Sequence, residues 1–288
     1  MSGLKLELGN EPTSVNTNEI VTFPRRIGGL LKLFWKDDTG ADVKLRPETT
    51  DEITEGNNKF FNEQRVNNVL LTPLYSKVRD DFISSTTAGN LAWANSINGT
   101  GAGATVIAPP TADSCGVVQL STGITTTGRA SLYLPSNLMA FGGFRTRLSW
   151  LVRLPQLGNA LNSFSATVGF GDTTTLLYDH ADGAYFKYDY SLSAALWRIV
   201  TANNSIRTDQ ETAVVVQAGG WALLQIDVKA DGTLAEFYIN GTLAGSIDSN
   251  IPIDFVNRLF GPICKIESRL GTTAKLLHID YFAMEIFR

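Results

Sequence analysis

The chain has 288 residues and a mass of 31.3 kDa, a length that suits one large β-domain with an accessory region. Hydrophobic residues make up 43% and charged residues only 18%, which with 26 glycines favours strands and turns over long charged helices. A net charge of -4 without a dense run of lysine and arginine disfavours nucleic acid as a partner.

The first residues, MSGLKLELGNEPTS, lack the basic start, apolar run and small-residue cleavage site of a signal peptide. No apolar run approaches the roughly 18 residues of a membrane helix. We therefore expect a protein that is made in a cytoplasm and is not a membrane protein. Cys115 and Cys264 are too few for a disulfide framework, so we expect two small buried hydrophobic residues.

Residues 1–48 contain short β-like runs separated by turns. The runs LLKLFW and DVKLR flank Asp37-Asp38-Thr39-Gly40, and this pattern predicts a hairpin because Asp and Gly favour tight turns. A module this small cannot bury a deep core, so we expect it to need a neighbouring protein. Phe34 and Trp35 are its candidate attachment residues, since Trp is enriched at binding hot spots.

Residues 49–80 form the predicted connector, which begins with TTDEITEGNNKFFNEQRVNNVLL. Phe61, Arg65 and Val69 follow each other at helical spacing, which predicts a short amphipathic helix that ends before Pro73. From spacing alone, an ordinary interdomain helix packed on the next domain fits equally well.

The same stretch resembles a short element of bacteriophage tail-fibre and related virion proteins. The matching residues are Thr50, Asp51, Glu52, Ile53, Glu55, Gly56, Asn58, Phe60, Phe61 and Arg65. The chain departs from that family at Phe60-Phe61-Asn62, where Tyr-Phe-Thr is usual, and at Val66, where a small residue is usual. The resemblance implies a virion protein and, since such families are commonly trimeric, a homotrimer. The predicted subunit interface consists of Phe60, Phe61, Val66, Val69 and Leu70.

Residues 81–288 read as a long series of short strands bounded by Gly, Pro, Asn or Asp, which predicts a β-sandwich or barrel. In RTRLSWLVRL one strand face carries Leu148, Trp150, Val152 and Leu154, and the other carries Arg145, Arg147, Ser149 and Arg153. We therefore expect the first face in the core and the second in solvent. Two turns, Ala230–Thr233 and Asn240-Gly241, divide Gly219–Ile247 into a predicted three-stranded meander.

That meander, with its Trp221 entry and the ending LLHIDYFAMEIF, resembles the concanavalin A-like (laminin G-like) jelly roll. The resemblance implies an all-β fold: a C-terminal antiparallel jelly-roll sandwich over 81–288, preceded by a small β module and a short helical connector. This pattern also closes the distal domains of many phage fibres.

Catalytic patterns are missing from the sequence. The glucanase relatives carry E-x-D-x-x-E on one strand, whereas Asp227, Glu236, Glu267, Asp280 and Glu285 are each isolated among apolar residues. Two histidines and two distant cysteines have no zinc spacing, and no nucleophile or phosphate-loop motif occurs. We expect no enzyme and no cofactor.

Two groups of residues remain as candidate binding sites. Tyr188, Tyr190 and Trp197 are candidates for a sugar-stacking platform, although aromatic residues at period two are also typical of a core. Asp179 and Asp182 lie in an Asp- and Gly-rich loop that can supply oxygen ligands to Ca²⁺, or simply form a hairpin turn.

The sequence thus predicts a phage virion protein, assembled in the host bacterial cytoplasm, that docks on capsid, tail or neck proteins through its N-terminal part. Its sandwich would display a surface for recognising a host-surface glycan. Two alternatives stay open: a capsid decoration or head-fibre protein without a receptor role, and a polysaccharide-binding or depolymerising enzyme.

Overall fold

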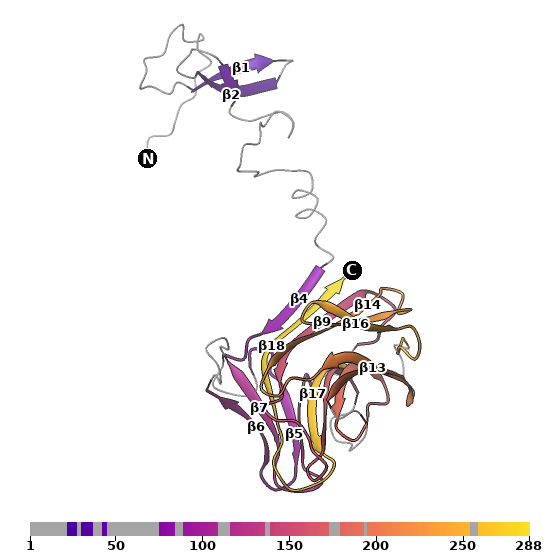
Figure 1. Ribbon diagram of the computed structural model, residues 1–288. Helices are drawn as coiled ribbons and strands as arrows, with labels where there is room; N and C mark the ends of the chain where they lie inside the picture. The colour runs from indigo at the N-terminus through magenta and orange to yellow at the C-terminus, as the bar shows by residue number, and fades with distance from the viewer. Residues whose placement is uncertain are drawn as a thin grey trace. The chain divides into compact units, whose positions relative to one another are not determined.

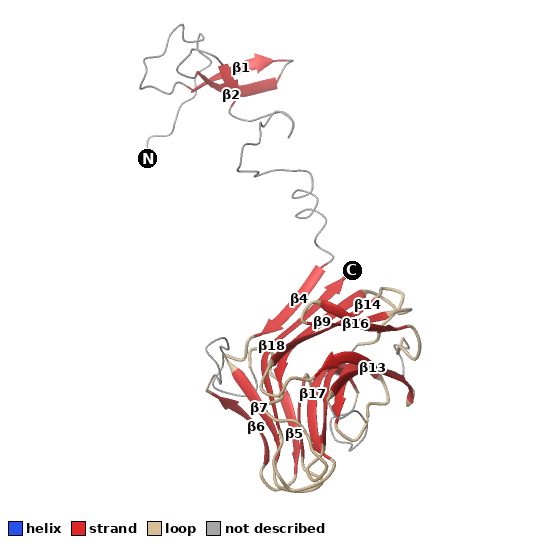
Figure 2. Ribbon diagram, in the orientation of Figure 1, coloured by secondary structure: helices blue, strands red, loops and turns tan. Residues whose placement is uncertain are grey.

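The computed structural model describes residues 22–27, 30–36, 42–44, 75–83, 89–108, 116–135, 139–172, 179–192, 195–253 and 259–288. For the strands up to residue 44 and for Tyr75 it describes the backbone alone. The chain divides into two compact units, Met1–Pro73 and Leu74–Arg288. Every regular element within the described ranges is a strand (Figure 2), so they contain no helix that could cross a membrane.

The N-terminal unit contains a small antiparallel sheet. Its strands are β1 (Thr22–Ile27), β2 (Leu30–Lys36) and β3 (Asp42–Lys44), in the order β1-β2-β3. Trp35 pairs with Val43, which confirms the predicted hairpin around Asp37–Gly40. The helix predicted after residue 49 lies outside the described residues.

The C-terminal unit is a sandwich of two antiparallel sheets, as predicted (Figure 1). One sheet has the order β13-β12-β11-β10-β17-β8-β5 and consists of β5 (Ala94–Asn98), β8 (Arg129–Tyr133), β10 (Phe164–Gly171), β11 (Gly183–Asp189), β12 (Leu196–Asn203), β13 (Ile206–Val215) and β17 (Gly261–Ser268). The other has the order β16-β15-β14-β9-β18-β7-β6 with β4 beside β18, and consists of β4 (Tyr75–Asp80), β6 (Ala102–Ile107), β7 (Val117–Thr122), β9 (Arg145–Arg153), β14 (Trp221–Val228), β15 (Ala235–Ile239), β16 (Thr242–Ile247) and β18 (Leu276–Phe287). We call them the seven-stranded and the eight-stranded sheet.

The core lies between the two sheets and follows the predicted alternation. Leu148, Trp150 and Val152 of β9 are buried there, while the arginines of the same strand lie on the opposite face. Trp150 packs against Phe282 at 4.7 Å and against Trp93 at 5.3 Å between ring centroids. Such pairs add about 0.5–1.5 kcal/mol each beyond the burial of their area. Cys264 is also buried in the core, as expected, and its thiol is free.

The predicted meander is confirmed as β14, β15 and β16 in neighbouring positions. Asn240 and Gly241 form its second turn, with φ values of 51° and 79°. Positive φ at both central residues is the backbone of a type I′ turn, which matches the twist of the paired strands.

The start of the sandwich differs from the predicted boundary at residue 81. Tyr75–Asp80 was assigned to the connector, but it forms β4 and pairs with the end of β18 (Figure 1). Asp80 then accepts hydrogen bonds from three backbone N–H groups and from the indole nitrogen of Trp93. The predicted boundary is wrong because the alternation in YSKVRD is weak, and the open edge of β18 makes it a strand.

Candidate functional site

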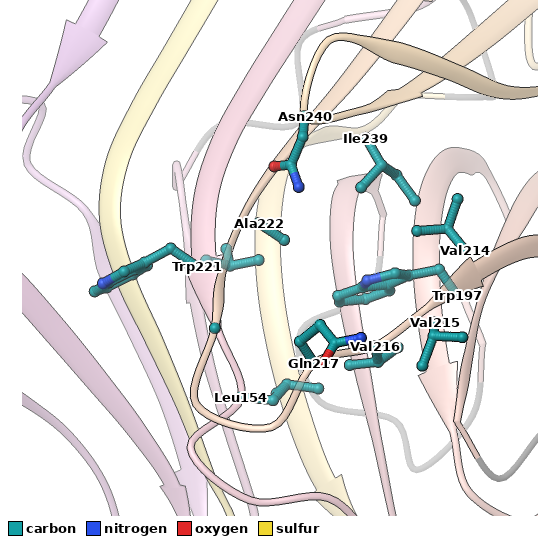
Figure 3. A pocket seen from close by; sticks show the side chains of 12 residues that line it. Leu154, Trp197, Val214, Val215, Val216, Gln217, Trp221, Ala222, Ile239 and Asn240 are labelled. Carbon is teal, nitrogen blue, oxygen red and sulfur yellow. The ribbon is translucent and has the colours of Figure 1, made fainter.

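A small pocket opens between the two sheets at the end of the sandwich where β9 ends and β14 begins (Figure 3). Its volume is about 50 Å³. Residues from five strands and the segment between β13 and β14 line it: Val152, Leu154, Trp197, Val214, Val215, Val216, Gln217, Gly220, Trp221, Ala222, Ile239 and Asn240. None of these side chains is charged, so the pocket is suited to a neutral group.

Trp197 is the central side chain of this pocket (Figure 3). Thr212 donates a hydrogen bond of 2.7 Å to the Trp197 carbonyl, and Phe186 contacts the indole edge to face at 6.3 Å. These contacts hold the ring, which is only 3% exposed. Among the described residues, the indole nitrogen has no hydrogen-bond acceptor. The pocket therefore offers one fixed donor among apolar walls.

The rim of the pocket carries two amide side chains, those of Gln217 and Asn240. The Asn240 side-chain oxygen accepts a hydrogen bond of 2.9 Å from the Leu223 backbone, which fixes the plane of the amide. Gln217 and Val215 are exposed, so the pocket is open to solvent on this side. Trp221 also belongs to the lining, but Figure 3 shows its ring directed away from Trp197.

A second, larger depression lies on the outer face of the eight-stranded sheet, at its other end. This hollow has a volume of about 500 Å³ and is lined by Arg145, Asp227, Lys229, Ala230, Asp231 and Glu236. The Tyr238 hydroxyl donates to Glu236 at 3.2 Å, which places that phenol beside the hollow. Both anionic and cationic side chains line it.

Asp227 binds two arginines at the hollow. Arg145 binds its carboxylate through two hydrogen bonds of 2.9 and 2.7 Å, and Arg147 through two of 3.0 and 2.7 Å. Burial alone would raise the pKa of Asp227, but the hydrogen bonds from the two arginines outweigh it and hold that pKa below its usual value. The same contact raises the pKa of Arg145, so both groups stay charged.

A third group of polar residues is buried on the outer face of the seven-stranded sheet. Ion pairs connect Asp179, Lys187, Asp189, Arg269, Glu267 and Lys265 in that order, with separations from 2.7 to 3.7 Å. We call this set the ionic network. It contains three acids and three bases, so its charges balance. The Lys187, Asp189, Lys265 and Glu267 side chains are each at most 4% exposed.

Residues 179–182, at the described end of the segment between β10 and β11, lie against this face. His180 of that segment is fully buried, packs on the Tyr185 ring at 5.0 Å and contacts Gly171, where a methyl group would collide with the imidazole. Arg207 of β13 donates to the carbonyls of Asp179 and His180 at 3.1 and 3.2 Å. These contacts hold the described part of the segment against the sheet.

Burial dominates the proton affinities in this region. It raises the pKa of Glu267 and lowers that of Lys265, and each partner opposes the effect only in part. Burial likewise lowers the pKa of His180 and raises that of Tyr185 well above its usual value. A carboxyl with a raised pKa is typical of general acids, but Glu267 is ion-paired and inaccessible in this conformation.

The prediction that Tyr188, Tyr190 and Trp197 form an exposed surface for sugar stacking is wrong for Tyr188 and Trp197. Tyr188 and Trp197 are buried in the core, where Tyr188 packs on Phe164 at 4.9 Å and accepts a hydrogen bond from the Gly158 backbone. Tyr190 is half-buried and packs against the same core. The aromatic side of β11 faces the opposite sheet, because burying it gains more than exposing it. Trp197 still reaches solvent through its pocket.

The two aspartates predicted to bind calcium have other partners. Asp179 is paired with Lys187 at 2.9 Å, and Asp182 accepts a hydrogen bond of 2.8 Å from the Asn204 backbone. Burial would raise the pKa of Asp179, but Lys187 holds it below the usual value. Within the described ranges, no group of three or more His, Cys, Asp or Glu side chains is arranged to hold a metal ion.

The remaining predicted residues fall where side chains are not described. Phe34 and Trp35 lie in β2, opposite Phe23 and Thr22 of β1. The predicted interface residues, Phe60, Phe61, Val66, Val69 and Leu70, lie outside the described residues altogether.

Sequence reasoning missed the ionic network and the arginine clamp on Asp227. A usable signal was present: Lys187 and Asp189, and likewise Lys265 and Glu267, are charges two residues apart inside apolar strands. Such spacing places both charges on one face. The partner of such a charge can lie 80 residues away, as Arg269 does from Asp189 and Asp227 from Arg147. No local pattern reveals such pairs.

Comparison with known proteins identifies a family and supports the fold. Residues 113–280, more than half of the chain, match the family described as SO2946-like, C-terminal domain. No curated protein matches the chain significantly.

Among solved structures, the chain is similar to protein SO2946 of Shewanella oneidensis MR-1, described as of unknown function: the TM-score is 0.53 and the identity 13%, over 81% of this chain and 96% of that one. A carbohydrate esterase of the Shiga toxin-encoding bacteriophage phi24B has a TM-score of 0.48 and 14% identity, over 73% of this chain and 98% of that one. The carbohydrate recognition domain of Emp47p has a TM-score of 0.46 and 10% identity, over 74% and 97%. Of these three structures, only that of SO2946 has a TM-score above 0.5, and at 13% identity its likeness to this chain concerns the fold alone.

Proposed function

We propose that this chain, which belongs to the family of SO2946-like C-terminal domains, is a non-enzymatic bacteriophage virion protein whose sandwich recognises a glycan on the host surface. The N-terminal unit attaches it to capsid, tail or neck proteins through a surface that includes Phe34 and Trp35. The connector residues around Phe60 and Val69 join three copies.

The hollow on the eight-stranded sheet is the observation that carries glycan recognition. Each sugar hydroxyl donates and accepts hydrogen bonds, so a glycan site needs both kinds of partner at close range. Arg145 and Lys229 supply donors there, while Asp231 and Glu236 supply acceptors. Asp227 fixes Arg145 in place through two hydrogen bonds. A volume of about 500 Å³ accommodates one or two sugar rings of a longer chain.

The pairing of the buried acidic residues argues against a hydrolytic role for these residues. Glycoside hydrolysis requires two accessible carboxyl groups on either side of the scissile bond. Asp227 is held by two arginines. Asp189 and Glu267 share Arg269, at 3.7 and 2.7 Å, and both are almost fully buried. The buried carboxylates of these two clusters are thus neutralised and shielded from substrate.

The division of the chain into two units supports display on a particle. The unit Leu74–Arg288 contains the whole core described above. A virion protein of this kind needs one part that docks and another that faces outward. The resemblance of residues 49–71 to tail-fibre proteins points in the same direction.

A glycan array with the full-length protein tests the binding function. Glu236→Ala and Lys229→Ala remove one acceptor and one donor from the hollow, and each should weaken binding to any glycan found. Glu211→Ala is the matched control, since it removes an exposed glutamate from β13 of the other sheet. The proposal fails if no glycan binds, or if the hollow variants bind as the unchanged protein does.

Measuring protein on particles tests the virion role. The protein should be present in purified particles of the phage that encodes it, and deletion of residues 1–48 should abolish its incorporation. Incorporation of the shortened protein would overturn the proposed direction of attachment. Release of reducing sugar or acetate from host polysaccharide by the purified protein would favour the enzyme alternative.

A further inference from the structure

We infer that the Trp197 pocket binds the acetamido group of an N-acetylated sugar. The inference rests on the proposed glycan recognition and adds a second contact site to it. The pocket and the hollow are separate: Val152 and Ala222 line the pocket, whereas Arg145 and Asp227 line the hollow at the opposite ends of β9 and β14.

The size of the pocket selects a small group. One water molecule needs about 10–15 Å³ of such space, so about 50 Å³ holds three to five atoms of that size. An acetamido group has four non-hydrogen atoms. A whole sugar ring is too large, and would remain outside at the rim.

The lining matches the two halves of an acetamido group. Leu154, Val214 and Val216 provide apolar surface for the methyl group (Figure 3). The Trp197 indole nitrogen can donate to the carbonyl oxygen, and it has no competing acceptor among the described residues. A ligand oxygen at this position therefore gains a hydrogen bond without first breaking one to the described residues.

The absence of charge in the lining distinguishes this group from others of equal size. A carboxylate or an ammonium group would lose its hydration on entry, and no lining side chain carries an opposite charge to compensate. An acetamido group is neutral and half apolar. The amides of Asn240 and Gln217 at the rim can then bind sugar hydroxyls.

Titration of the full-length protein with free N-acetylglucosamine, followed by the indole N–H signals in NMR, tests the inference. The chain has five tryptophans, and the Trp197→Phe variant identifies the signal of Trp197. That signal should shift and saturate with N-acetylglucosamine and stay unchanged with glucose. Trp197→Phe keeps most of the ring but removes the donor, so it should weaken binding about two- to tenfold.

Two further variants keep the test decisive if Trp197→Phe disturbs the core. Ala222→Leu fills the pocket from the opposite wall and should abolish the effect of the acetylated sugar. Ile206→Ala should leave it unchanged, because that side chain is 63% exposed at the start of β13 and does not line the pocket. The unfolding transition of each variant serves as the control for folding.

The outcomes separate this inference from the proposed function. Equal response to glucose and N-acetylglucosamine, or binding that survives Ala222→Leu, overturns the inference. If the glycan array then still shows binding that depends on Glu236 and Lys229, glycan recognition stands. If no glycan binds in either experiment, both proposals are overturned.

Discussion

Arg145 of β9 binds Asp227 of the neighbouring strand β14 in a two-pronged contact, Nε to Oδ1 at 2.9 Å and Nη2 to Oδ2 at 2.7 Å. The arginine is 47% exposed while the carboxylate is 4% exposed. In the hollow, an arginine that is open to solvent is therefore held by a carboxylate that is almost inaccessible.

Replacing Asp227 by asparagine should lower stability by roughly 1–3 kcal/mol, because a buried acceptor of charged hydrogen bonds is lost. Urea unfolding measures the change. Asp209→Asn is the control, since it breaks the partly exposed pair with Arg198 and should cost about 1 kcal/mol or less. Equal losses in the two variants would contradict a special role for Asp227.

Removal of both members of a buried pair in the ionic network should lower the stability of the protein less than removal of one member. Glu267→Gln leaves Lys265 buried beside a neutral group, which should cost about 3–5 kcal/mol. The double replacement of Lys265 by Met and Glu267 by Leu should cost less than Glu267→Gln alone. A double mutant less stable than the single one would mean that the network itself stabilises the fold.

The two histidines should make stability depend on pH in a defined range. Burial, with a smaller contribution from Arg153, lowers the pKa of His278 to about 4, and burial lowers the pKa of His180 as well. The unfolded histidines bind protons near pH 6.5 while the folded ones do not, so stability should fall as the pH drops from about 6.5 towards 4.

Urea midpoints at about pH 7 and pH 4.5 measure this fall. His278→Gln removes one of the two titrating groups and should make the decrease smaller, while leaving the contribution of His180. An unchanged decrease would show that the pKa of His278 is the same in the folded and the unfolded protein.

The boundary at β4 leads to a prediction about truncation. A chain that starts at Leu74 should unfold cooperatively with the stability of the full-length sandwich. A chain that starts at Asp81 loses β4 and the acceptor Asp80, which leaves the Trp93 indole and three backbone N–H groups without their acceptor. It should be clearly less stable by urea unfolding, and equal stability would make β4 a dispensable edge strand.

Light scattering on the same chains tests the proposed trimer. The full-length protein should have the mass of three chains, and the chain from Leu74 the mass of one, because the proposed interface precedes that residue. A monomer in both cases would leave residues 49–71 as an ordinary connector. A trimer in both cases would place the interface on the sandwich.

Local patterns in the sequence determined the strands and turns whose conformation depends on near neighbours. The alternation in β9 revealed its buried face, and the Asn240-Gly241 turn defined the meander, because side-chain period and positive φ are properties of a few consecutive residues. The all-β sandwich followed from many such elements.

Only the tertiary structure decided which charges meet and which aromatic residues reach solvent. Arg147 reaches Asp227 across 80 positions, and β4 became a strand because the edge of β18 was available to it. Tyr188 and Trp197 are both aromatic residues within strands, yet the packing of the sheets encloses one and leaves a pocket beside the other. Such outcomes depend on the pairing of distant strands, for which the sequence carries no local signal.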